Sequence, residues 1–182
     1  AHPIAGLEKS GPEHGFAELL KNRYCILTPI NNDEKKLNRV KMFWEKIGMQ
    51  IETMQPDHHD RVLAMTSHIP QLIAYSIVFT ANELEDHLKN EVLKYSAAGF
   101  RDFTRLAGSD PIMWRDIYKM NKDSVIEMLG RFTEDLTTLQ KAIRNEDLKF
   151  LENTFSSTRE IRQTIENLGQ AGSFDPTEKI KK

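Results

Sequence analysis

The run Ile69–Ala81 constrains the fold most, because IPQLIAYSIVFTA is apolar on almost every face of a helix. A helix of this kind must be covered on all sides. The run falls within a predicted helix over residues 57–84, which Pro70 is expected to bend. A second subunit is the simplest source of cover, so we predict a homodimer with interleaved helices, with a monomeric bundle as the alternative. The run is shorter than the span of a bilayer, so no membrane segment is predicted.

The composition limits the kinds of partner that the chain can bind. The chain has 182 residues, and its 25 basic and 27 acidic residues are well mixed, for a net charge of −2. This balance argues against a nucleic-acid surface and against a basic membrane patch. Cys25 is the single cysteine, which excludes an internal disulfide and a cysteine zinc site. It also suits a reducing compartment, so a cytoplasmic location is expected.

The first third of the chain has an α/β pattern. The expected elements are a loop over 1–11, a short helix within 12–22, a strand over 23–28, a helix over 33–47 capped by Asn32, and a strand over 49–54. Gly48 supplies the helix stop. This is too little to build a sheet with both faces covered. We therefore expect residues 1–55 to be one part and residues 56–182 an all-helical domain.

The helical part contains further elements with recognisable ends. The predictions are an amphipathic helix over 85–95, one or two turns over 100–107, a helix from Asp110–Pro111, a helix from Asn121 or Asp123 to a break at Arg144–Asn145, and a helix over 147–168. The last two should form an antiparallel hairpin. The tail that follows is expected to fray.

The stretch Gly99–Asp116, GFRDFTRLAGSDPIMWRD, is unusually dense in charge for a connector. One interpretation is a salt-bridged junction between helices. The other is a carboxylate-binding corner, because a guanidinium group matches a carboxylate with two parallel hydrogen bonds. The residues alone leave both open.

The histidines do not predict a metal site. His58–His59–Asp60 followed by His68 lacks the H-E-x-x-H spacing, and adjacent histidines on a helix point about 100° apart. No P-loop, G-x-S-x-G, C-x-x-C or G-x-G-x-x-G occurs in the sequence. Taken alone, His2 is a terminal loop residue and His68 a hydrogen-bonded core residue.

Separated blocks together resemble one family. They are HPIAGLEKSG near the start, ILTP at Ile26–Pro29, HD…SHIPQLIA across His59–Ala74 and GFRDFTRLAGSDPIMWRDI at Gly99–Ile117. In this order they are similar to the prephenate/arogenate (cyclohexadienyl) dehydrogenases of tyrosine biosynthesis. The resemblance implies a mainly α fold: an all-helical dimerisation and substrate-binding domain preceded by the C-terminal α/β remnant of a Rossmann nucleotide-binding domain.

The resemblance also implies roles for particular residues. His2 matches the catalytic histidine, which takes the proton of the ring hydroxyl while hydride leaves for NAD or NADP and CO₂ is lost, giving 4-hydroxyphenylpyruvate. Arg105 matches the substrate-binding arginine. The other matching pocket positions are Ser67, His68, Gln71 and Trp114, and Glu8 and Asp60 match acids that position the histidine and the arginine. Asp60 could equally be an ordinary surface charge.

Two departures from the family pattern matter. Gln71 stands where some relatives carry a second pocket histidine, which bears on the choice between prephenate and arogenate. The dinucleotide fingerprint is missing, so no cofactor-binding residue is assigned and this chain alone is expected to be inactive. The alternative function is a non-catalytic helical dimer that binds aromatic acids or a protein partner. Another β-hydroxyacid-type dehydrogenase is disfavoured by the block FTRLAGSDPIMW.

Overall fold

A computed structural model describes residues 1–6, 11–31 and 33–167 of the chain. The predictions for Glu8, for Asn32 as a cap and for the tail from Leu168 onward lie outside these described residues. The chain divides into two compact units, which are described separately. One unit comprises Ala1–Gly6, Gly15–Pro56 and the chain from Gly130 onward, and the other includes Asp57–Leu129.

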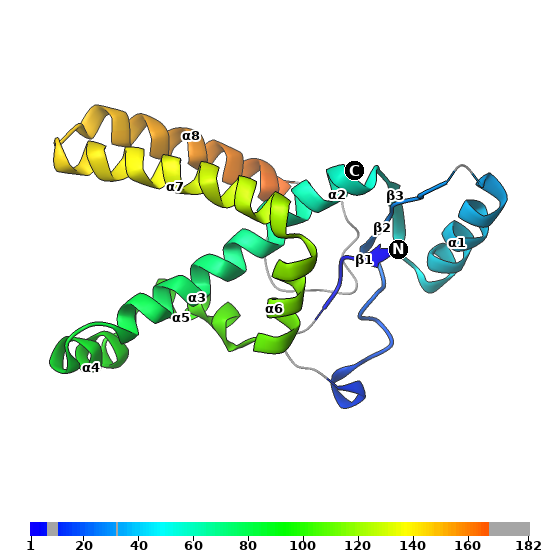
Figure 1. Cartoon of the computed structure of the whole chain (residues 1–182), viewed down its shortest axis with the longest axis horizontal. Coiled ribbons are helices and arrows are strands. Elements are labelled where there is room, and N and C mark those ends of the chain that lie inside the picture. Colours follow the sequence, from blue (N-terminus) through cyan, green and yellow to red (C-terminus); the bar gives the residue numbers. More distant parts are fainter. Residues whose placement is uncertain (7–10, 32, 168–182) are drawn as a thin grey trace. The chain divides into compact units, whose positions relative to one another are not determined.

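The first unit contains a small mixed sheet of order β1-β2-β3 (Figure 1). Its strands are β1 (His2–Pro3), β2 (Tyr24–Leu27) and β3 (Gln50–Thr53). β1 runs antiparallel to β2, with His2 opposite Ile26, and β3 runs parallel to β2. The predicted loop over 1–11 therefore begins with a strand. Because a two-residue strand exists only through its pairing with a distant segment, no local pattern could reveal it.

The helix α1 (Glu34–Ile47) connects the two parallel strands. Its N-cap is Asp33, whose side chain accepts a hydrogen bond from the Lys36 amide at 3.1 Å. The helix ends at Gly48, which adopts the left-handed conformation with φ 97°. The core of this unit is formed by the buried residues Cys25, Leu27 and Met49, with Leu20, Leu37, Trp44 and Ile51 packed around them. Burial raises the pKa of the Cys25 thiol.

The prediction of a short helix within 12–22 holds only for the first residues of that range. The structure has a short 3-10 helix, η1 (Pro12–His14), followed by turns from Ala17 to Asn22. Gly11 and Asn22 both take positive φ values, 109° and 58°, which a right-handed helix cannot include. The apolar residues in this segment therefore belong to turns, and Leu20 among them packs onto the core.

The second unit is organised around one continuous helix, Pro56–Asn82. It consists of α2 (Pro56–Leu63), a π-helical segment η2 (Ala64–His68) and α3 (Ile69–Asn82). The π-helical segment meets a steric requirement of Pro70, which has no N–H and whose ring would clash with the carbonyl of Thr66 in an α-helix. The amide of Ile69 instead reaches back to the carbonyl of Ala64. The helix expected over 57–84 is confirmed, with its irregularity just before Pro70.

Much of this helix lacks cover within one chain. Ile77, Val78 and Phe79 are 37%, 40% and 66% exposed. The apolar run Ile69–Ala81 by itself is shorter than a bilayer span, whereas the continuous helix of 27 residues that contains it is long and apolar enough by length and composition. The central helix of a soluble protein meets the same criterion, so this is weak evidence for a membrane span.

Shorter helices follow. They are α4 (Asp86–Lys94), α5 (Ala98–Thr104), the 3-10 turn η3 (Arg105–Gly108) and α6 (Pro111–Met120). The predicted start of α6 is confirmed, because the Asp110 carboxylate accepts hydrogen bonds from the amides of Ile112 and Met113 at 2.8 and 2.9 Å. Pro111 occupies the first helical position, where an N–H would have no helical partner.

A long helical hairpin ends the described chain. α7 (Lys122–Arg144) and α8 (Leu148–Asn167) are joined by a short turn in which Glu146 has φ 53°, so α8 runs back along α7 (Figure 1). The predicted break at Arg144–Asn145 is confirmed. Of the two predicted caps of α7, Asp123 lies inside the first turn. Asn121 directly precedes the helix and its carbonyl accepts from the Val125 amide at 3.1 Å, but its side chain bonds to the preceding long helix instead of capping α7.

The cap of α6 gives a stability prediction. Asp110→Ala should reduce the free energy of unfolding by about 1 kcal/mol, because two amides lose their acceptor. Urea denaturation followed by circular dichroism measures the change. Asp116→Ala is the matched control on the same helix, since its exposed ion pair with Arg115 contributes little. An equal loss from both variants would contradict the capping role.

Candidate functional site

The imidazole of His68 lies at the centre of a small polar and aromatic cluster in the second unit. His68 ends the π-helical segment and is 8% exposed. Trp114 and Tyr118, one turn apart on α6, present their rings edge-on to it, with centroid distances of 6.1 and 6.4 Å. The π-helical segment and α6 together therefore fix the plane of this ring.

Hydrogen bonds join the same elements. Asn121, which follows α6 directly, points its amide nitrogen at the carbonyl of Asp60 (2.8 Å) and at Nδ1 of His68 (3.2 Å). The Tyr118 hydroxyl donates to the carbonyl of His68 at 3.1 Å. Inside a π-helical segment some carbonyls lose their usual helical donors, and a side chain can supply the replacement.

Two groups in the cluster have unusual environments. The indole nitrogen Nε1 of Trp114 is buried and has no hydrogen-bond partner among the described residues. A buried donor of this kind costs free energy unless a ligand or partner satisfies it. Burial, followed by the nearby Tyr75, raises the pKa of Tyr118 to about 12, so its hydroxyl stays protonated at neutral pH.

The turn η3, which begins with Arg105, is held by side chains of α3. The amide nitrogen of Gln71, which is 2% exposed, donates to the carbonyl of Leu106 at 2.6 Å. The Tyr75 hydroxyl, one helical turn further on, donates to the carbonyl of Ser109 at 3.0 Å. These two bonds fix both ends of the turn, so its backbone and the base of the exposed Arg105 side chain have a defined place.

The predicted site residues divide between the units. Arg105, Ser67, His68, Gln71 and Trp114 all lie on η2, α3, η3 and α6 of the second unit. His2 lies exposed on β1 of the first unit. The backbone carbonyl of Asp60 contacts the cluster, because it accepts a hydrogen bond from the Asn121 side chain. The Asp60 carboxylate lies 2.8 Å from the His59 ring nitrogen.

The other charges of the arginine-rich stretch make local contacts. Arg101 donates to the carbonyl of Ser96 at 3.0 Å, and Arg115 pairs with its neighbour Asp116 at 2.8 Å. Asp110 is occupied as a helix cap. These contacts join residues close in sequence. They therefore contribute little to a salt-bridged junction between helices, which was the first of the two interpretations of this stretch.

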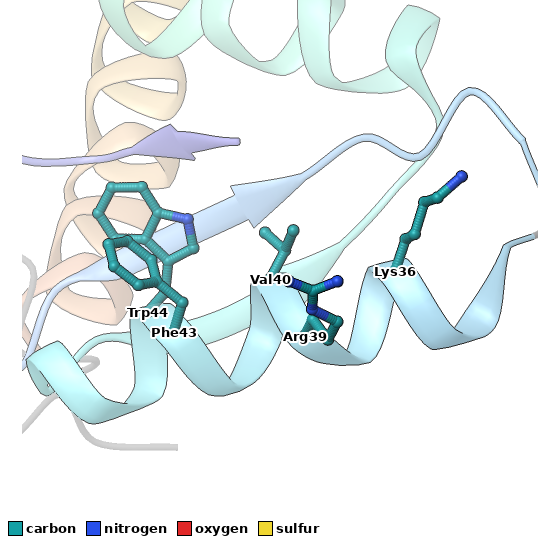
Figure 2. Close-up of a pocket in the computed structure, with 5 residues that line it drawn as sticks. All are labelled: Lys36, Arg39, Val40, Phe43 and Trp44. Carbon is teal, nitrogen blue, oxygen red and sulfur yellow. The ribbon is translucent and has the colours of Figure 1, made fainter.

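Each unit has a surface hollow among its described residues. A polar one of about 530 Å³ lies around the α6–α7 junction. It is lined by Asp57, Asp60, Arg61, Lys119, Met120, Asn121, Lys122, Asp123, Ser124 and Glu127. The second, of about 490 Å³, lies along α1 in the first unit, where Lys36, Arg39, Val40, Phe43 and Trp44 line it (Figure 2). The Phe43 and Trp44 rings meet edge-on there, 5.1 Å apart.

In the described part of the chain, no three His, Cys, Asp or Glu side chains gather in a way that could hold a metal ion. The strand–helix–strand unit β2–α1–β3 has the topology of a nucleotide-binding domain. The turn that leads from β2 into α1 contains Pro29 and Asp33 and lacks the glycine-rich pattern that cradles a pyrophosphate.

Two protein-family models match the chain, one for each of its two parts. The family model "Prephenate dehydrogenase, nucleotide-binding domain" matches residues 1–53, and "Prephenate dehydrogenase, dimerization domain" matches residues 55–157. The chain is 37% identical over 166 residues to the cyclohexadienyl dehydrogenase of Zymomonas mobilis, covering 91% of this chain and 57% of that protein. It is 32% identical to the prephenate dehydrogenase of Bacillus subtilis, covering 90% of this chain and 44% of that one.

A solved structure is similar to this chain in the same family. Prephenate dehydrogenase from A. aeolicus, in complex with hydroxyphenyl propionate and NAD⁺, is 38% identical and superposes with a TM-score of 0.84, over 90% of this chain and 57% of that chain. The chain thus spans about half the length of the curated relatives that it matches.

Fold and comparisons together define the class: the α/β end of a nucleotide-binding domain joined to a helical dimerisation domain. The predicted fold class is confirmed. The chain belongs to the prephenate dehydrogenase family. None of the comparisons favours the non-catalytic alternative.

Sequence reasoning missed three side chains of the site: Tyr75, Tyr118 and Asn121. Each bonds to a residue at least 34 positions away in the chain. Spacing patterns report only neighbours on one element, so these contacts had no local signal. The one available clue was that Tyr75 lies four residues after Gln71, on the same helical face.

The bonds from α3 to the η3 turn can be tested directly. Tyr75→Phe removes only the hydroxyl that donates to Ser109, so the amides of the Arg105–Asp110 segment should exchange faster with solvent, by about 5-fold to 10-fold for a bond worth about 1 kcal/mol. Hydrogen exchange read by mass spectrometry measures this. Tyr95→Phe, an exposed tyrosine, is the control. Unchanged exchange in Tyr75→Phe would show that the hydroxyl does not restrain the turn.

Proposed function

We propose that this chain supplies the substrate-binding and dimerisation part of a prephenate or arogenate dehydrogenase. The reaction is the oxidative decarboxylation of prephenate to 4-hydroxyphenylpyruvate, with hydride passing to NAD or NADP, as a step of tyrosine biosynthesis in the cytoplasm. Support comes from family membership and from the A. aeolicus relative, which was solved with hydroxyphenyl propionate and NAD⁺.

The observation that carries the proposal is the anchored turn at Arg105. Gln71 and Tyr75 fix its backbone, which limits the positions that the guanidinium group can reach. A substrate with two carboxylates needs a cation in a defined place, and a bidentate pair both binds and orients it. Arg105 is therefore proposed as the residue that binds a substrate carboxylate.

The cluster around His68 is proposed as the wall of the same pocket. Ser67 and His68 present a hydroxyl and an imidazole from the π-helical segment, and Trp114 brings a buried indole N–H without a partner in the described chain. Together these groups offer donors to substrate oxygens beside aromatic surface. Gln71 has its amide nitrogen committed to Leu106 and keeps a carbonyl oxygen as an acceptor.

His2 is proposed as the general base. A neutral imidazole with an ordinary pKa of about 6.5 can accept the proton of the ring hydroxyl at neutral pH. Its backbone is set by pairing of β1 with β2, where His2 lies opposite Ile26. Loss of the ring carboxylate as CO₂ then makes the product ring aromatic. Asp60, whose backbone carbonyl contacts the His68 cluster, and Glu8 are proposed as acids that position the catalytic histidine and the substrate-binding arginine.

In the proposed reaction the cofactor accepts the hydride. The described residues do not fit a dinucleotide phosphate group, because the β2–α1 turn lacks a glycine-rich pattern. We also propose that the protein works as a homodimer, which the name of the matched dimerisation domain and the uncovered apolar helix both support.

The roles of Arg105 and His2 separate kinetically. The test uses a chimaera that joins this chain to the nucleotide-binding half of the Z. mobilis relative. In it, Arg105→Ala should raise KM for prephenate by about 10-fold to 100-fold, because one charged hydrogen-bond pair with the substrate is lost. His2→Asn should lower kcat by about 10²-fold to 10⁴-fold, with little change in KM. Steady-state formation of reduced cofactor measures both.

The matched control is Arg101→Ala, in the same charged stretch, whose side chain donates to the carbonyl of Ser96. It should leave KM within about twofold. Equal and modest effects of Arg105→Ala and His2→Asn on both constants would contradict the assigned roles. A chimaera without activity toward either prephenate or arogenate would contradict the proposed function.

A further inference from the structure

Asn121 has a role that neither the sequence patterns nor the comparisons assign. It lies between α6 and α7, is 9% exposed, and its side chain reaches back across the sequence to the long helix. Its amide nitrogen is 2.8 Å from the carbonyl oxygen of Asp60 and 3.2 Å from Nδ1 of His68. One NH₂ group thus contacts two potential acceptors at once, one part-buried and one buried.

The contact with Asp60 fixes which way the amide faces. A backbone carbonyl oxygen can only accept a hydrogen bond, so the Asn121 atom beside it must be the nitrogen. A flipped amide would place two oxygen atoms 2.8 Å apart in a part-buried site, with no hydrogen between them. The second hydrogen of the same nitrogen is then directed at His68.

This donor determines the state of the His68 ring. Because the Asn121 nitrogen donates, Nδ1 of His68 must accept, so Nδ1 carries no proton. A neutral imidazole has one N–H, which must therefore be on Nε2. The rings of Trp114 and Tyr118 both meet His68 at interplanar angles of 81°, and this packing favours one orientation of the ring.

We propose that Asn121 is a positioning residue that fixes His68 in the Nε2–H tautomer. In this tautomer Nε2 can only donate, and under the proposed function an anionic or hydroxyl oxygen of the ligand is a matching acceptor. This use of the donor rests on the proposed function, whereas the tautomer itself does not. Asn121 would thereby act on substrate binding without touching the substrate.

The tautomer can be read by nitrogen-15 NMR of the ring nitrogens, recorded on the intact chain at a pH of about 8.5, where an ordinary histidine is neutral. The His68 signals are assigned by their loss in His68→Gln. The expected result for the unmodified chain is an unprotonated Nδ1 and a protonated Nε2. A protonated Nδ1 would overturn the proposal, and this measurement needs no substitution of Asn121.

Variants of Asn121 test the cause. Asn121→Asp keeps the size but offers only acceptors, so Nδ1 of His68 should become protonated. Asn121→Leu removes the donor, so a fraction of Nδ1–H should appear. Tyr118→Phe is the matched control, because it removes a bond to the backbone carbonyl of the same His68 and should leave the ring tautomer unchanged. An unprotonated Nδ1 in a folded Asn121→Asp chain would overturn the proposal.

A binding measurement separates this inference from the proposed function. Calorimetric titration with 4-hydroxyphenylpropionate should show a Kd about 10-fold weaker for Asn121→Leu than for the unmodified chain, since one buried donor to the ligand loses its fixed position. Tyr118→Phe should weaken binding less. If the unmodified chain has the Nε2–H tautomer and binds no ligand, the proposed function loses its support while the role of Asn121 stands.

Discussion

The helix Pro56–Asn82 imposes the constraint on which the second unit depends, because it is apolar along much of its length and one chain covers only part of it. In its α3 part, Ile69, Gln71 and Ala74 are buried, whereas Ile77, Val78 and Phe79 are exposed. Apolar area left in water at this scale marks an interface. The family's dimerisation domain supports the proposal that a second copy of the chain covers this face.

The same helix also builds the site. The π-helical segment that precedes Pro70 changes the helical register, and this places His68 and its carbonyl where Asn121 and Tyr118 can bond to them. Further along, the regular α-helix sends Gln71 and Tyr75 to the turn of Arg105. A packing element and a binding element are thus one segment, so a substitution that loosens its cover should also disturb the pocket.

Local signals in the sequence predicted local structure well. Asp110–Pro111 before an apolar run and Gly48 after one marked real helix ends, because capping involves residues three or four positions apart. The sequence did not predict strand β1, the turns of residues 17–22 or the bonds of Asn121, since each depends on partners far away in the chain. The roles of His2 and Arg105 came from resemblance to the family rather than from any physical signal at those residues.

The measurement that tests the account most directly is sedimentation equilibrium of the purified chain without detergent. If a second copy covers the helix Pro56–Asn82, the mass should be twice the chain mass of 21.0 kDa, and Phe79→Asp, a charge placed on the exposed apolar face, should shift it toward a single chain. A mass of 21.0 kDa at every concentration tested would contradict the claim that this helix is an interface between two copies.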